Sequence, residues 1–200
     1  MGYFHLVFTL PHKLNGLILT NKKILLSHLF KAVGETLVDF GHTRLGGQVG
    51  FITVLHTWDQ TLLDHFHLHC LVPAGALSFD QKRWSPARKN FLFPVKALSI
   101  VFCGKFLDLL KKAFAQNQLL FVGQSACLAN PTAFQLLIQA LRKKPWVVYA
   151  NLSDLPSMSW TTSAATPTAW RSPMIGFSQP IAEKSLLVTG TEKITTEKRP

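Results

Sequence analysis

Long apolar runs, acidic residues and cysteines are all scarce in this chain of 200 residues. No stretch reaches the roughly 18 consecutive apolar residues that a membrane-spanning helix needs, and the opening residues MGYFHLVFTLPHK contain no basic leader or small-residue cleavage site. We therefore expect a cytoplasmic protein without a membrane partner. Cys70, Cys103 and Cys127 are too few and too widely spaced for a disulfide framework or a paired-cysteine zinc site.

The charge is strongly one-sided, because 10 acidic residues face 21 lysines and arginines, which gives a formal net charge of +11. Basic proteins gain affinity for polyanions by releasing counterions from phosphates, so the charge favours nucleic acid as the partner. Trp58 and Trp84 are candidate platforms on which bases could stack. The basic residues that we expect to contact DNA are Lys22, Lys23, Arg83, Arg88, Lys89, Lys111, Lys112, Arg142, Lys143 and Lys144.

Two segments of different composition meet near residue 150. Residues 1–150 contain 16 lysines and arginines against 6 acidic residues, and they include all eight histidines. In residues 151–200, 20 of the 50 residues are serine, threonine or proline. Such a segment cannot bury enough apolar surface to offset its chain entropy. We therefore predict a folded domain over 1–150 and a disordered tail over 151–200.

Apolar periodicity predicts the elements of the folded part. Short β-rich runs predict strands, which we place at Tyr3–Leu10, Val49–Trp58, His67–Pro73 and Trp146–Ala150. Three- and four-residue apolar steps predict helices, which we place at Ile18–Phe40, Val95–Phe114 and Pro131–Arg142. This order predicts an α+β domain with a mostly antiparallel sheet and helices on its faces.

The residues that point most directly to chemistry lie between His56 and Cys70, in HTWDQTLLDHFHLHC. His67 and His69 are separated by one apolar residue, so on a strand both imidazoles point to one face of the sheet. Two imidazoles make half of a divalent-metal site, which needs a third group and open positions for water or phosphate oxygen. Both His56 and Gln60 are candidates for the third ligand, because both lie shortly before the pair.

Three segments carry a family resemblance: YFHLVFTLPHKLN, GFITVLHTWDQTLLDHFHLHCLVPAGAL and RKKPWVVYA. Over about 2–150 the chain resembles the insertion-sequence transposases of the HUH superfamily that carry two tyrosines. The resemblance implies a ferredoxin-like sheet with His67 and His69 on its central strand and a bound divalent cation, Mg²⁺ or Mn²⁺. It also implies nicking of single-stranded DNA at transposon ends by a tyrosine that becomes joined to the 5′ phosphate.

We expect two features of that family to be missing from this copy. Its cysteine-rich zinc-binding region would precede the YFH strand, and its nucleophile helix, with the pattern YLGRYTHR, would follow Ala150. The chain has only two tyrosines, Tyr3 and Tyr149, both in predicted strands. We therefore assign no catalytic residue and expect this copy to be inactive. The alternative is a basic nucleic-acid-binding module with no nuclease ancestry.

A shift of reading frame explains the lost motif. In the shifted frame, each codon consists of the third base of one codon of this chain and the first two bases of the next. Read in that frame with suitable synonymous codons, residues 157–172 (SMSWTTSAATPTAWRS) give HVLDYLGRYTHRVAI. The first tyrosine codon would then straddle Thr161 and Thr162, and the second would straddle Ala165 and Thr166. The hypothesis is that one base was lost at or near the Asn151 codon; the alternative is a natural low-complexity linker.

Overall fold

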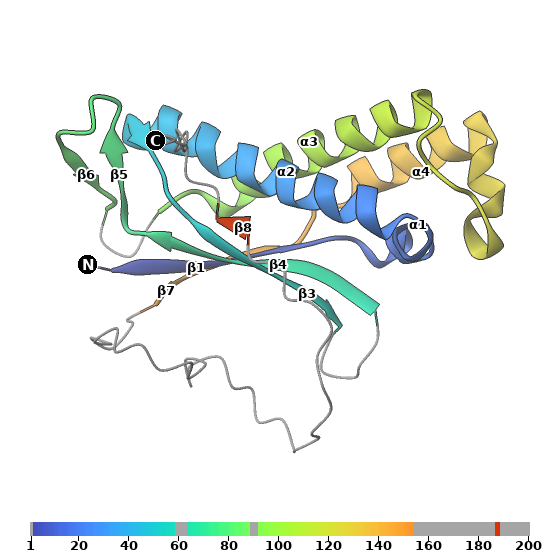
Figure 1. Ribbon diagram of the computed structural model, residues 1–200, viewed down its shortest axis with the longest axis horizontal. Coiled ribbons are helices and arrows are strands. Elements are labelled where there is room, and N and C mark those ends of the chain that lie inside the picture. Colours follow the sequence, from blue (N-terminus) through green and yellow to red (C-terminus); the bar gives the residue numbers. More distant parts are fainter. Residues whose placement is uncertain (1, 59–63, 89–91, 154–186, 189–200) are drawn as a thin grey trace, which may run out of the picture.

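Residues 2–58, 64–88, 92–153 and 187–188 are described by the structure, a computed structural model (Figure 1). Its strands are β1 (Tyr3–Thr9), β2 (Gly47–Gln48), β3 (Ile52–Trp58), β4 (Asp64–Pro73), β5 (Gly75–Ser78), β6 (Trp84–Pro86), β7 (Val148–Ser153) and β8 (Leu187–Val188). Its α-helices are α1 (Asn15–Thr20), α2 (Lys22–Phe40), α3 (Val95–Ala115) and α4 (Pro131–Lys143). Shorter helical turns are η1 (His12–Leu14), η2 (Gly41–Leu45) and η3 (Gly123–Ala129).

The larger sheet has five strands in the order β7-β1-β4-β3-β8, and every pairing in it is antiparallel. With β8 and the small sheet β2-β5-β6 left aside, and consecutive helices counted together, the chain runs strand, helix, strand, strand, helix, strand, and the two middle strands in space are β1 and β4. That connectivity is the ferredoxin-like arrangement. The predicted α+β class with an antiparallel sheet is therefore confirmed, and β4 occupies the central position predicted for the strand of His67 and His69.

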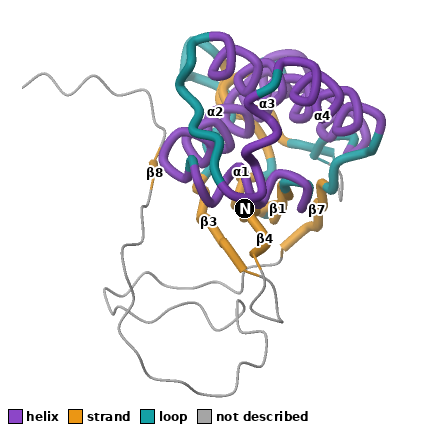
Figure 2. The backbone as a smooth tube through the Cα atoms, turned by 90° about the vertical axis from the view of Figure 1, so that its right-hand side faces the viewer, coloured by secondary structure: helices purple, strands orange, loops and turns teal. Residues whose placement is uncertain are grey.

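Helices α2, α3 and α4 all lie on the same face of this sheet, as Figure 2 shows from the side. The core forms between the two layers, because alternate strand residues such as Phe8 and Leu68 are fully buried there against residues of the helices. Phe102 of α3 packs edge-on against Phe8 and against Trp146, which precedes β7. The described helices therefore leave the opposite face of the sheet uncovered.

The single helix predicted over Ile18–Phe40 is wrong, because the structure has two helices that meet at Asn21. The buried Asn21 side chain donates to the carbonyls of Leu17 and Leu120 and accepts from the backbone N–H of Leu120. Asparagine readily bonds to nearby backbone and so competes with a continuous helix. Apolar periodicity continues across residue 21, which is why the sequence pattern alone does not reveal the break.

Replacing Asn21 with alanine should lower the free energy of unfolding by about 1–3 kcal/mol, because the backbone N–H of Leu120 loses its partner in a partly buried position. Urea denaturation followed by circular dichroism measures the change. Ser27→Ala is the control, since the Ser27 hydroxyl bonds to the Lys23 carbonyl on an exposed surface and its loss should cost much less. An equal loss of unfolding free energy in the two variants would contradict the stabilising role of the bonds between Asn21 and Leu120.

Several predicted strand boundaries need correction. Val49 lies outside β3, because its side chain packs directly against Gly41 at the end of α2. β4 begins at Asp64 rather than at His67, so His65 also belongs to the strand. Trp146 lies outside β7, because its buried indole donates to the carbonyl of Leu141 at the end of α4. The small sheet β2-β5-β6 is absent from the predicted elements.

The predicted boundary at Ala150 falls within β7, which continues through Ser153. Leu187 and Val188 pair with Thr53 and Ile52 at the edge of the large sheet. The rest of the predicted tail, 154–186 and 189–200, lies outside the described residues. Among the described helices, none combines the length and the hydropathy that a bilayer crossing requires.

Candidate metal centre

Strand alternation places the histidines of β4 on the uncovered face of the sheet. Phe66, Leu68, Cys70 and Val72 are buried beneath the helices, so the residues between them point the other way. The His67 and His69 side chains therefore share one face, as the HLH spacing predicted. The hydrogen-bonded register adds a third histidine, because His56 of β3 is the direct partner of His67.

One ring nitrogen from each of His56, His67 and His69 lies within 4.8 Å of the other two. The Nε2 atoms of His67 and His69 are 3.1 Å apart. Two imidazole nitrogens that share one tetrahedral cation at about 2.0–2.1 Å lie about 3.3 Å apart, so this spacing suits a shared cation. Of the two candidates for the third ligand, His56 is part of the cluster, and Gln60 lies outside the described residues.

The protonation of His67 is fixed by its backbone neighbour. Its Nδ1 lies 2.7 Å from the carbonyl oxygen of His65, and a carbonyl can only accept, so Nδ1 carries the hydrogen. In the neutral ring, Nε2 then keeps its lone pair and faces the cluster. This is the arrangement in which a metal-binding histidine donates its other ring N–H to an outer partner.

Burial keeps the cluster neutral. Burial lowers the pKa of His56. It also lowers the pKa of His67, although the hydrogen bond to the His65 carbonyl raises that pKa in part. The pKa of His69 is lowered to about 3, chiefly by burial and further by charge repulsion from His56, His67 and His5. Neutral imidazole is the form that binds a metal ion, so these side chains need release no proton to do so at neutral pH.

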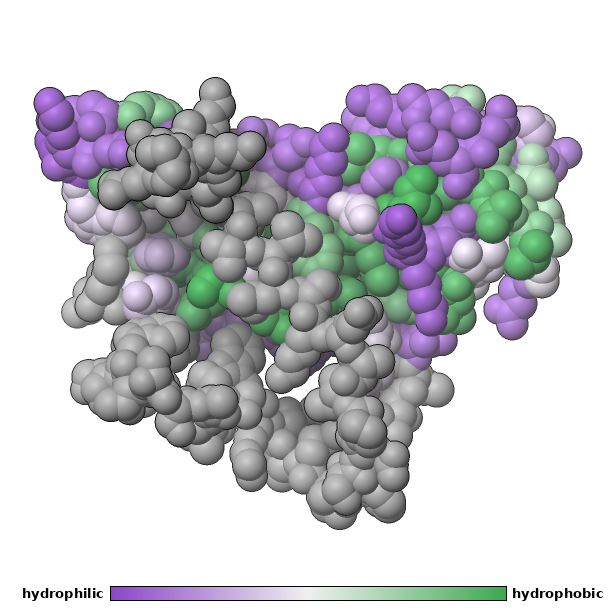
Figure 3. Space-filling model, in the orientation of Figure 1, coloured by the Kyte–Doolittle hydropathy of each residue, from purple (hydrophilic) through white to green (hydrophobic). Residues whose placement is uncertain are grey.

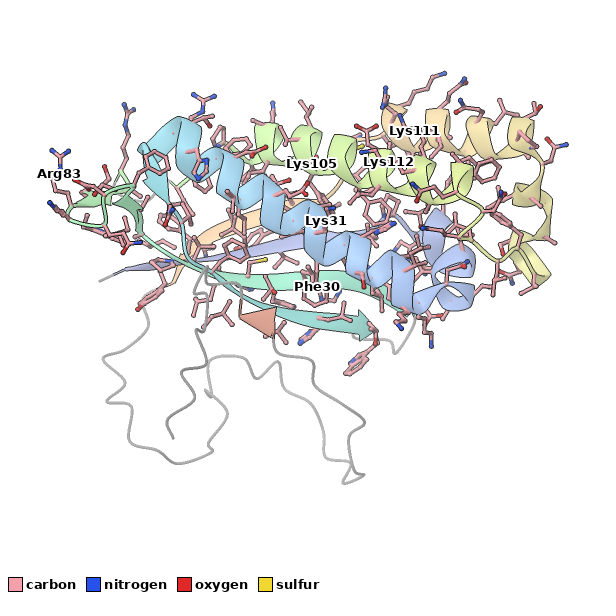
Figure 4. All side chains as sticks on the ribbon, turned by 45° about the horizontal axis from the view of Figure 1, so that its top comes forward. Phe30, Lys31, Arg83, Lys105, Lys111 and Lys112 are labelled. Atoms are coloured by element: carbon pink, nitrogen blue, oxygen red, sulfur yellow. The ribbon has the colours of Figure 1, made fainter. Side chains whose placement is uncertain are left out.

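The predicted DNA contacts lie away from this cluster. Lys22 and Lys23 open α2, and Lys111 and Lys112 lie on α3. Arg142 and Lys143 end α4, and Lys144 follows it directly. All of them belong to the helical layer, where Figure 3 shows extensive hydrophilic surface. In Figure 4, Lys111 and Lys112 lie on the helices, and Arg83 lies on the β5–β6 hairpin at the other end of the molecule. Arg88 follows that hairpin, and Lys89 lies outside the described residues.

Some of the helical lysines are already paired. Lys111 contacts Asp108 at 2.8 Å, and Lys105 contacts Asp39 at 2.9 Å. Lys22 and Lys23 instead line a shallow depression of about 450 Å³ where α1 meets α2. These residues are surface charges dispersed over the helical layer and the hairpin, and the structure does not gather them with the histidines.

Of the two candidate stacking platforms, Trp58 is close to the cluster. It ends β3, its side chain is 51% exposed, and its ring lies parallel to that of His56 with centroids 6.2 Å apart. Trp84 belongs to β6 in the small sheet. The structure therefore places one aromatic platform beside the histidines and the other on a separate sheet.

The sequence pattern did not single out two histidines that contact the histidines of β4 from other elements. His5 of β1 lies 2.8 Å from His69, measured from Nε2 to Nδ1, and His12 of η1 lies 3.3 Å from His65, measured from Nε2 to Nδ1. The alternation of buried and partly exposed residues in β1 would have placed His5 on the uncovered face. Its closeness to His69 depends on the strand register, which local sequence does not contain.

Comparison with known proteins supplies the family context. A family model described as "Putative transposase" matches residues 50–154, which include all three clustered histidines. The chain is 42% identical over 151 residues to "Putative transposase y4qJ" of Sinorhizobium fredii (strain NBRC 101917 / NGR234), a match that covers 74% of this chain and 38% of that protein.

It is also 39% identical over 94 residues to "Transposase for insertion sequence element IS801" of Pseudomonas savastanoi pv. phaseolicola, a match that covers 47% of this chain and 21% of that protein. The matches therefore span less than two fifths of the length of either relative. No solved structure gives a significant match.

Proposed function

The chain belongs to this transposase family, and on that premise we propose that its core is the metal-binding part of an enzyme that nicks and transfers single-stranded DNA. The observation that carries the proposal is the group of three neutral imidazoles on the uncovered face of the sheet. Both relatives are named as transposases, which supports DNA, and transposon ends in particular, as the substrate. Family membership disfavours the alternative of a binding module without nuclease ancestry.

The donor set also bears on which cation binds. Magnesium prefers oxygen ligands, whereas imidazole suits first-row transition ions. Of the two expected cations, Mn²⁺ therefore fits His56, His67 and His69 better than Mg²⁺ does. When bound, the cation would polarise the scissile phosphate and balance charge on the leaving oxygen. The protein's own part is to hold the three rings neutral, with His67 oriented by the His65 carbonyl.

We further propose that this copy binds DNA without cutting it, because neither of its two tyrosines matches a nucleophile position of the family pattern YLGRYTHR. Tyr149 lies on the uncovered face of β7, opposite Val7, and Val7 in turn pairs with His69. One strand therefore separates Tyr149 from His69, which at the usual strand spacing puts their backbones about 10 Å apart. Tyr3 lies further along β1. The mechanism by tyrosine attack would need the two codons that the proposed frame shift has removed.

The uncovered face favours contacts with bases over contacts with phosphates. Strands β1, β3, β4 and β7 contain no lysine or arginine. Exposed apolar and aromatic side chains surround the histidines instead, among them Val54, Trp58 and Tyr149. A single DNA strand would thus be held near the metal by stacking of its bases on these side chains. The basic residues of the helical layer and the hairpin would contact only those phosphates of the strand that extend past this face.

Replacing Trp58 with alanine should weaken binding of a short single-stranded oligonucleotide by about 5- to 150-fold, the equivalent of about 1–3 kcal/mol for one stacked base. Because stacking releases no counterions, the salt dependence of binding should stay nearly unchanged. Fluorescence anisotropy at several salt concentrations measures both quantities.

Phe79→Ala is the matched control for this experiment. Phe79 is 57% exposed but adjoins the small sheet, so its loss should leave affinity within about twofold. An equal loss of affinity in the two variants, or binding to duplex DNA as tight as to the single strand, would contradict the proposed role of this face.

A further inference from the structure

His5 reaches the proposed metal centre from the neighbouring strand. It lies on β1, two residues before Val7, which is the direct partner of His69. His5 Nε2 lies 2.8 Å from His69 Nδ1, a normal hydrogen-bond length. The rings of His5 and His69 are nearly coplanar and meet edge to edge through these nitrogens, with centroids 5.0 Å apart and planes 10° apart. His5 is absent from the three-histidine group, so its contact with the site runs through His69.

That hydrogen bond determines which nitrogen of His69 is available to a cation. Between two neutral imidazoles, one nitrogen must donate and the other must accept. If His5 donates, the hydrogen of His69 sits on Nε2 and points at His67 Nε2, 3.1 Å away, which blocks a shared cation. If His69 Nδ1 donates, its Nε2 keeps a lone pair beside that of His67. Only the second arrangement offers two ligands at once.

We propose that His5 is a positioning residue that accepts the Nδ1–H of His69 and thereby turns the His69 Nε2 lone pair toward the cation shared with His67. The His65 carbonyl performs the same task for His67. Metal-bound histidines usually donate their second ring N–H to a carboxylate, a carbonyl or water, and here a neutral imidazole takes that place. This inference rests on the proposed metal-binding function and extends it to a residue on a third strand.

Two substitutions of His5 distinguish the effect of its hydrogen-bond acceptor from the effect of its aromatic ring. His5→Phe keeps an aromatic ring beside His69 but has no acceptor. His5→Gln has no ring, but its amide oxygen can accept the His69 N–H. Titration with Co²⁺, whose visible absorption reports the ligand field, should show affinity reduced by about 10- to 100-fold in His5→Phe. Affinity in His5→Gln should recover to within a fewfold of the unsubstituted protein, and thermal melts check that both variants fold.

A second readout uses Zn²⁺, a diamagnetic ion that imidazole binds. In the Zn²⁺-bound protein, NMR should show the Nδ1–H of His69 protected from exchange with water by its hydrogen bond to His5 Nε2, and His5→Phe should lose that protection. Unchanged Co²⁺ affinity and unchanged protection of this N–H in His5→Phe would overturn the inference. So would a His5→Gln protein as weak as His5→Phe, because the ring rather than the acceptor would then be what matters.

The failure of the proposed function would look different. If the unsubstituted protein binds no Co²⁺ at the cluster, the metal centre itself is disproved. If instead the unsubstituted protein binds Co²⁺ and His5→Phe binds it equally well, the metal centre stands and the inference about His5 is overturned.

Discussion

Replacing His69 with alanine is expected to reduce Mn²⁺ affinity by about 100-fold or more. Even the outer partners of metal ligands commonly contribute about 10- to 100-fold, and His69 would supply a ligand atom directly. Its Nε2 lies 3.1 Å from that of His67, so the variant loses one side of the proposed cation site. Isothermal titration calorimetry measures the affinity, and thermal denaturation shows whether the variant remains folded. His56→Ala should have an effect of the same kind, because His56 completes the group of three.

A histidine remote from the cluster provides the matched control. His42 is exposed in η2, beyond the end of α2, and its ring packs against Phe79 rather than against any of the three clustered histidines. His42→Ala should therefore bind Mn²⁺ as the unsubstituted protein does. Weak binding by a folded His42→Ala protein, or unchanged binding by His69→Ala, would show that the metal binds elsewhere. Mg²⁺ should compete poorly in all these proteins, since imidazole is a poor ligand for it.

Inserting one base at the Asn151 codon is expected to change a protein that forms no adduct with DNA into one that does. On the frame-shift hypothesis, the inserted base would restore two tyrosine codons, one straddling Thr161 and Thr162 and the other straddling Ala165 and Thr166. A tyrosine that attacks phosphorus forms a covalent intermediate in which the bond energy is kept for strand transfer. The assay incubates each protein with single-stranded oligonucleotides that carry transposon ends, in Mn²⁺, and separates the products by denaturing electrophoresis. Only the frame-restored chain should give a band of protein joined to DNA.

Three variants make this result specific. In the restored chain, the double substitution His67→Ala and His69→Ala should remove the adduct, because the phosphate would lose its cation. In the original chain, Tyr3→Phe and Tyr149→Phe should change nothing. An adduct in the original chain that maps to either tyrosine would contradict the claim that this copy lacks a nucleophile. A gene sequence whose shifted frame does not encode YLGRYTHR would contradict the frame-shift hypothesis.

The local sequence pattern was sufficient to predict features that depend on a single strand or a single helix. The HLH spacing placed His67 and His69 on one face with Leu68 in the core, because side chains alternate on any strand. The helix over Pro131–Arg142 differs from α4 by one residue. The ferredoxin-like arrangement came from family resemblance, and the sheet order agrees with it.

The features that the sequence did not specify depend on contacts between distant residues. His56 remained one of two candidates for the third ligand, because only the pairing of β3 with β4 brings it opposite His67. His5 was overlooked for the same reason, since it meets His69 across 64 residues of sequence. Asn21 interrupts a regular apolar pattern because of its bonds to Leu120, 99 residues away. Strand register and long-range side-chain bonds are products of the folded chain, so periodicity cannot reveal them.

Anomalous X-ray diffraction from crystals of this protein grown with Mn²⁺ tests the metal centre most directly. We expect one strong peak at the uncovered face of the sheet, within bonding distance of a ring nitrogen from each of His56, His67 and His69. His5 Nε2 should then lie at hydrogen-bond distance from His69 Nδ1, outside the inner ligands. A map in which the manganese peak lies elsewhere, or in which the three rings have no peak between them at saturating Mn²⁺, would contradict the proposed metal centre.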